Sequence, residues 1–206
     1  MTTSVLLDAA AEAAEITASL VARADPSYEW GMRRTVPSEQ PAHATRVPEV
    51  RKVAAAWSRE HRGAPAPDVL AVCEALWASG WREERIAAIQ LLGRRPAFGQ
   101  VEWGRIERWS REIDNWEHVD NLADVTGRLL QRRPDLLGEV GRIAASDHPW
   151  QRRLALVTLI VAARDGRWEP ELTVLTERLT GDKHPLVRKA VVWAHRELRQ
   201  RETAHD

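Results

Sequence analysis

The chain has 206 residues, of which 44% are hydrophobic and 29% charged, a composition typical of a soluble globular protein with ample chain for a core. No apolar run reaches the ~18 residues of a transmembrane helix, the acid-containing N-terminus lacks the basic region of a signal peptide, and the single Cys73 excludes an intrachain disulfide framework and indicates a reducing compartment. Acidic and basic residues balance at 30 each, which counts mildly against nucleic-acid binding.

Helical segments separated by short breaks are predicted along almost the whole chain. Residues 6–24 favour a helix that Asp25 and Pro26 end, and the prolines of residues 31–47 predict a loop. Pro48 then lies near the first turn of the next helix. Later segments of about 10–16 residues show apolar spacing near 3.6, and no alternating pattern predicts a strand. We expect residues 1–206 to form a single all-α domain, with residues 202–206 as a disordered tail.

A repeat of 34–36 residues runs through the second part of the chain. The repeated segments begin at Trp81, Trp116, Trp150 and Leu186, and each has charged residues in its first turn followed by an apolar stretch. A separate helical stretch precedes each one. Paired helices of this kind stack into a curved α-solenoid with one helix of each pair on the concave face. Core packing explains each repeat-start tryptophan equally well.

Three tryptophans share a helix face with a charged residue three or four positions later: Trp116 with Asp120, Trp150 with Arg153, and Trp193 with Arg196. If these faces line one concave surface, they form a cleft with aromatic walls, two arginines and one carboxylate. Aromatic faces and a carboxylate favour a cation, and arginines hold phosphates. The pattern therefore fits a cationic group on a phosphate-bearing polymer. The alternative, which we weigh more heavily from the residues alone, is core tryptophans and exposed helix charges.

Three segments carry a resemblance to a known family: "NWEHVD", "ASDHPWQRRLALV" and "VRKAVVWAHRELR". They resemble the DNA alkylation repair glycosylases of the AlkD type, and "RVPEVRKVA" and "LWASGWREERIAAIQLL" extend the match to about residues 28–200. The histidines are dispersed and no Cys/His ligand spacing is present, so we expect no metal or other cofactor. The resemblance implies HEAT-like helix pairs and removal of cationic N3- or N7-alkylated purines from double-stranded DNA. It also implies a monomer in the cytoplasm, associated with the nucleoid.

The resemblance assigns roles to particular residues. The family's catalytic aspartate falls on Asp120, its active-site arginine on Arg153, and its wall aromatics on Trp116 and Trp193. It places Arg196 against DNA, and it leaves open whether Trp30 or Tyr28 serves as the N-terminal aromatic near the lesion. We also expect DNA contacts from Trp150 and from two cations at a helix start, Arg188 and Lys189. Arg188 and Lys189 fit a solvated helix face equally well. The N-terminal segment is longer than is usual in the family, the C-terminus is short, and the zero net charge departs from the family's basic surface.

The implied chemistry gives the carboxylate of Asp120 a reason to lie among apolar neighbours. It would stabilise oxocarbenium charge on the sugar and position water, while the aromatic walls contact the backbone and the base stays stacked. Such a mode, without base flipping, tolerates bulky adducts. Two alternatives stay open: a family member that binds DNA without catalysis, and a protein-interaction solenoid, which the neutral charge favours. Glu117 is expected to be solvated and Cys73 to lie in the core.

Overall fold

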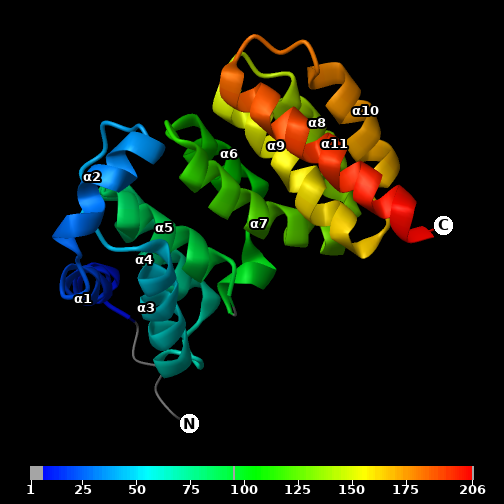
Figure 1. The fold of residues 1–206 in the computed structure, drawn as a ribbon. Coiled ribbons are helices and arrows are strands. Elements are labelled where there is room, and N and C mark those ends of the chain that lie inside the picture. The colour runs from blue at the N-terminus through cyan, green and yellow to red at the C-terminus, as the bar shows by residue number, and fades with distance from the viewer. Residues whose placement is uncertain (1–6, 95, 206) are drawn as a thin grey trace. The chain divides into compact units, whose positions relative to one another are not determined.

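The computed structural model describes residues 7–94 and 96–205 of the chain (Figure 1). In this part of the chain there are eleven α-helices, three short 3-10 helices and no strand, which confirms the predicted all-α class. No helix in it is long and apolar enough to cross a membrane. The chain groups into two compact units, Met1–Val101 and Glu102–Asp206, and each is described by itself. The prediction of one domain over the whole chain stays a prediction.

The described residues of the first unit form five α-helices and one 3-10 helix: α1 (Ala9–Val21), α2 (Pro26–Thr35), α3 (Val47–Glu60), α4 (Ala66–Ala78), α5 (Arg82–Leu92) and η1 (Ala97–Gln100). Helix α5 packs against both α3 and α4, and α1 covers α3 and α4. Buried aliphatic side chains fill the space between them, and Cys73 is fully buried as predicted.

The predicted loop at residues 31–47 is shorter in the structure and runs from Val36 to Arg46. The prediction was wrong for residues 31–35 because Asp25 and Pro26 begin a new helix rather than only ending the previous one. The Asp25 carboxylate accepts the backbone N–H of Ser27, and Pro26 occupies the first turn, where its missing N–H costs nothing. Helix α2 therefore continues to Thr35, just before Pro37.

Two buried residues of α5 anchor this loop. The Glu83 carboxylate accepts the backbone N–H groups of His43 at 2.9 Å and Thr45 at 3.1 Å, and it pairs with the Arg82 guanidinium at 2.8 Å. The His43 ring also stacks on Trp81, with 4.1 Å between ring centres. The loop backbone thus obtains the partners that a helix or sheet would otherwise supply.

In the second unit, residues 102–205 form six α-helices and two 3-10 helices: α6 (Trp103–Arg111), α7 (Trp116–Arg132), η2 (Pro134–Leu136), α8 (Leu137–Ala144), α9 (Pro149–Ala162), η3 (Ala163–Asp165), α10 (Glu169–Leu179) and α11 (Pro185–His205). Helix α9 is central and contacts α6, α7, α8, α10 and α11 (Figure 1). The last helix reaches His205, so the predicted disordered tail is helical over 202–205; Asp206 lies outside the described residues.

Each of the four repeated segments forms the second helix of a pair. Their first residues lie at or next to the starts of α5, α7, α9 and α11, and each of these helices packs on the helix before it. The predicted pairing of helices is therefore present within each unit. The repeat-start tryptophans Trp81, Trp116 and Trp150 are each partly buried, so part of every ring packs in the fold and part remains accessible.

Close contact between α7 and α9 positions the residues of interest. A Cβ atom added at Gly127 would lie 2.6 Å from Val161, so only glycine lets the two helices approach this closely. The residue before Gly127 is Thr126, and its hydroxyl is hydrogen-bonded to that of Thr158 at 2.6 Å in the core. These contacts fix the position of α7 along α9, and therefore which side chains of their first turns lie next to each other.

Candidate functional site

The first two turns of α7 present a partly open face. Asn115 caps the helix by accepting the backbone N–H of His118 at 2.9 Å. On the face that follows, Val119 is fully buried, whereas Trp116 and Asp120 are only partly buried. The predicted sharing of one face by the aromatic ring and the carboxylate is thus compatible with access from outside.

A bidentate ion pair joins Asp120 on α7 to Arg153 on α9. Arg153 Nε donates to Oδ1 at 3.0 Å, and Nη2 donates to Oδ2 at 2.8 Å. The arginine side chain is 8% exposed and the aspartate side chain 26% exposed. This side-on geometry holds the carboxylate in one orientation, while part of it remains accessible to a ligand.

Burial raises the pKa of the Asp120 carboxyl above its ordinary value of 3.8, and the hydrogen bonds and positive charge of Arg153 oppose that rise. Loss of hydration is the larger influence, because a partly enclosed carboxylate gives up water that one ion pair does not fully replace. Arg153 therefore helps to keep Asp120 ionised, and the raised pKa makes the carboxylate a better proton acceptor than an ordinary aspartate.

Adjacent arginines at the start of α9 have different tasks. The third bond of Arg153 runs from Nη1 to the backbone carbonyl of Leu186 in α11, at 2.7 Å. Arg152 instead pairs with Asp182, at 2.6 Å and 3.0 Å, and donates to the carbonyl of Ser146. Arg152 thus fastens the loops on either side, whereas Arg153 links the candidate aspartate to the first turn of α11.

The other two candidate tryptophans are partly buried on α9 and α11. The ring of Trp150 meets His184 edge-on, with 5.6 Å between ring centres. Trp193 donates its indole N–H to Glu197 Oε1 at 2.9 Å. A partner fixes each ring without covering it completely, so each retains surface for a ligand.

Cations of α11 complete the set of predicted residues in this unit. Arg188 is exposed, and its Nη1 donates to the backbone carbonyls of Asp182 and Lys183 at 3.0 Å and 2.7 Å. Lys189 and Arg196 are also exposed, and neither forms an ion pair with the rest of the described chain. Among the residues predicted to bind DNA, Lys189 and Arg196 are therefore the cations most available to an anionic partner.

Residues 16–205 match the family model described as "DNA alkylation repair enzyme". The chain belongs to the DNA alkylation repair enzyme family. A search of the curated proteins found no match. Family membership indicates a DNA substrate, and the matched region includes all ten residues predicted to act on or bind DNA.

The two N-terminal aromatic residues that are candidates for contact with DNA, Trp30 and Tyr28, lie in the first unit. Trp30 on α2 is 71% exposed, and the Arg34 guanidinium lies 4.5 Å from its ring centre. Tyr28 lies beneath Arg46, also at 4.5 Å. These arginine–aromatic stacks are cation–π pairs on the surface of that unit. Among the described residues, no group of three or more acidic, histidine or cysteine side chains could hold a metal.

Sequence reasoning missed two partners of the site and misjudged a third residue. The backbone carbonyl of Leu186 gives no sequence signal, whereas Glu197 lies four residues after Trp193, a spacing that places the two side chains on one helix face. Glu117, expected to be solvated, is 7% exposed. It lies on the side of α7 that faces the protein, next to the fully buried His118.

Proposed function

We propose that this family member is a DNA glycosylase that excises cationic N3- and N7-alkylated purines. The observation that supports the proposal most is the Asp120 carboxylate, which is oriented by Arg153, partly accessible, and on the same helix face as Trp116. A carboxylate fixed in this way can stabilise a positive charge that develops on a nearby sugar.

In the proposed reaction the bond between C1′ of the deoxyribose and the purine nitrogen breaks. Its electron pair passes to the alkylated base, which leaves as a neutral purine, and the sugar gains oxocarbenium character. Asp120 stabilises that charge at short range. Water then attacks C1′ and gives up a proton, which the raised pKa of Asp120 equips it to accept. No cofactor is required for this sequence of steps.

The surrounding side chains would position the DNA. Trp116 and Trp193 supply aromatic surface for the deoxyribose and backbone, and Arg196 and Lys189 supply cations for phosphates. We propose that the helix pairs form a curved HEAT-like solenoid whose concave face carries these groups, so that the lesion is approached through its backbone without base flipping. Such a mode would admit bulky adducts, and a DNA substrate would place the protein at the nucleoid.

The geometry suggests a different task for Arg153 from the phosphate contact expected from sequence. Three of its N–H groups are already engaged by Asp120 and by the Leu186 carbonyl, and its side chain is 8% exposed. We therefore propose that Arg153 acts through Asp120, by holding the carboxylate ionised and oriented. Arg196, which is exposed, is the better candidate for a flanking phosphate.

A DNA-binding protein without catalysis and a protein-interaction solenoid are the competing functions. Duplex DNA that contains N7-methylguanine, assayed for released base under single-turnover conditions, separates them. We expect release by the wild type and a loss of about 10²-fold or more for Asp120→Asn. Asp124→Asn is the matched control, since Asp124 lies one turn further along α7 and pairs with Arg128 at 3.0 Å on the surface.

Three outcomes of this assay are informative. Release that survives Asp120→Asn at the wild-type rate would contradict the proposed catalytic role. Absence of release, together with a gel shift that weakens steeply with salt, would favour the non-catalytic DNA binder. Absence of both release and DNA binding would favour the protein-interaction solenoid.

A further inference from the structure

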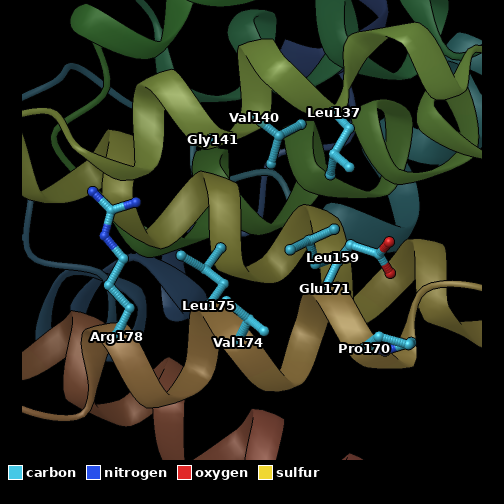
Figure 2. Close-up of a pocket in the computed structure, with 9 residues that line it drawn as sticks. All are labelled: Leu137, Val140, Gly141, Leu159, Pro170, Glu171, Val174, Leu175 and Arg178. Atoms are coloured by element: carbon cyan, nitrogen blue, oxygen red, sulfur yellow. The ribbon is translucent and has the colours of Figure 1, made fainter.

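A hydrophobic groove lies between α8 and α10, helices that contribute none of the proposed catalytic residues (Figure 2). Its volume is about 330 Å³, and Leu159 of α9 lies between the two walls. The α10 wall bears Val174, a large hydrophobic side chain that is 66% exposed. This face of the unit therefore has an apolar hollow, the groove, next to an apolar projection, the side chain of Val174.

Opposite charges stand at the two ends of this groove. Glu171 and Arg178 are seven residues apart on α10, which places them roughly 10 Å apart along the helix axis. In Figure 2 they point to opposite ends of the groove, with Val174 and Leu175 between them. Neither forms an ion pair with the rest of the described chain, and Glu171 Oε2 accepts no hydrogen bond there although it is shielded from solvent.

We propose that this face binds a second copy of the chain, with the two α10 helices antiparallel about a two-fold axis beside Val174. An α-helix turns by about 100° per residue, so around the axis of α10 the side chains of Glu171 and Arg178 lie roughly 60° and 40° from Val174, both on the same side of it. A two-fold axis at Val174, perpendicular to both helices, then places Glu171 of one copy opposite Arg178 of the other. Along the helix axis the two residues differ in position by only about 1.5 Å. The arrangement makes both ion pairs at once, as an isologous interface requires.

The residues on the other side of Val174 introduce no repulsion between like charges into the proposed dimer. Pro170 and Glu177 lie there, and the same symmetry places Glu177 opposite Pro170, so two like charges do not meet. Val174 meets its own counterpart at the axis and adds apolar contact beside each groove. One helix pair buries less than the ~800 Å² per partner of a standard stable interface, so we expect a dissociation constant between about 10 µM and 1 mM. This departs from the monomer expected from sequence.

Position 174 provides the test, because a residue on the axis faces itself. Val174→Glu and Val174→Lys each place like charges together, whereas a mixture of the two places opposite charges together. Both substitutions fall on an exposed side chain, so folding should survive them. In sedimentation experiments up to 1 mM, we expect wild-type dimers, a loss of association of at least about tenfold in each variant, and dimers again in the 1:1 mixture.

A second pair of variants tests the charges. Glu171→Arg and Arg178→Glu alone should each prevent association, and mixing them should restore it, since the mixed dimer has two opposite-charge pairs. A wild type that remains monomeric at 1 mM would overturn the proposal. Dimers that persist in the separate Val174 variants would also overturn it, because the copies would then meet through another surface. Neither result bears on the glycosylase assay, which uses dilute enzyme and a different set of residues.

Discussion

Replacing Asp120 by asparagine should reduce both excision and stability, because the structure gives its carboxylate a partner in the fold as well as a proposed role in catalysis. The substitution replaces two charge-assisted hydrogen bonds by at most one bond to the asparagine Oδ1, and it turns the asparagine NH2 toward the other guanidinium N–H, so that a donor faces a donor. Breaking a fully buried ion pair costs about 3–5 kcal/mol, and an exposed pair contributes about 0.2–1 kcal/mol.

The exposed fractions of the two side chains place the free energy of this ion pair between the values for fully buried and exposed pairs. Arg153 is 8% exposed and Asp120 is 26% exposed, so the arginine loses more hydration than the aspartate. Asparagine also removes the desolvation cost that raises the pKa of the carboxyl, which offsets part of the loss. We expect a net destabilisation of about 1–3 kcal/mol, or roughly 2–12 °C in melting temperature for a chain of this size.

A double substitution separates stability from catalysis. Asp120→Asn with Arg153→Met removes the stranded charge, so thermal stability should recover by at least about half. Excision should not recover, because no carboxylate remains. Asp124→Asn should change the free energy of unfolding by less than about 0.5 kcal/mol, as expected for a solvated pair within one helix. Equal melting temperatures for Asp120→Asn and Asp124→Asn would contradict the structural role of the Asp120–Arg153 pair, and excision by the double variant would contradict the catalytic role of Asp120.

Three further predictions concern protonation, DNA binding and packing. Excision should fall with decreasing pH at values above pH 3.8, because Asp120 takes up a proton through its raised pKa, and Arg153→Met should move this fall to still higher pH. Because the folded state binds this proton more tightly than the unfolded chain, the contribution of Asp120 to stability should decline as pH rises through the raised pKa. A pH series of melting curves measures that decline. Arg196→Ala should weaken binding to any duplex and lower the slope of log affinity against log salt by about one, with an unchanged melting curve. Gly127→Ala should cost about 1–3 kcal/mol in urea denaturation, since its Cβ would lie 2.6 Å from α9, whereas Gly138→Ala, with no atom within 4 Å, should not destabilise.

Local patterns in the sequence were sufficient to predict the helices and their pairing. Periodicity near 3.6 and the 34–36-residue spacing located the second helix of each pair, because both signals depend on side chains that face the same neighbour in every repeat. The errors came from segments where a residue has two local roles. Asp25 and Pro26 were interpreted as the end of one helix although they also start α2. The polar segment at 202–205 was interpreted as a tail although it continues α11.

The candidate site was predicted residue by residue, but not as a connected unit. The shared face of Trp116 and Asp120 follows from their spacing alone. The bond between Asp120 and Arg153 joins residues 33 positions apart, close to one repeat length, so it depends on how neighbouring pairs stack. The extent to which Asp120 is buried, which raises the pKa of its carboxyl, could not be predicted from the sequence either. These features depend on tertiary packing, and they changed the role proposed for Arg153.

Pairing with Arg153 also bears on how a neutral chain could act on a cationic lesion. The ion pair has no net charge, so at long range it attracts a cation weakly, and the 30 acidic and 30 basic residues of the whole chain give no general attraction for DNA. At short range the accessible part of the carboxylate still interacts strongly with positive charge that develops on an adjacent sugar. The proposed site should therefore discriminate alkylated from ordinary purines through the rate of bond breaking more than through affinity for the duplex. That is the behaviour expected of groups that stabilise a transition state in preference to the ground state.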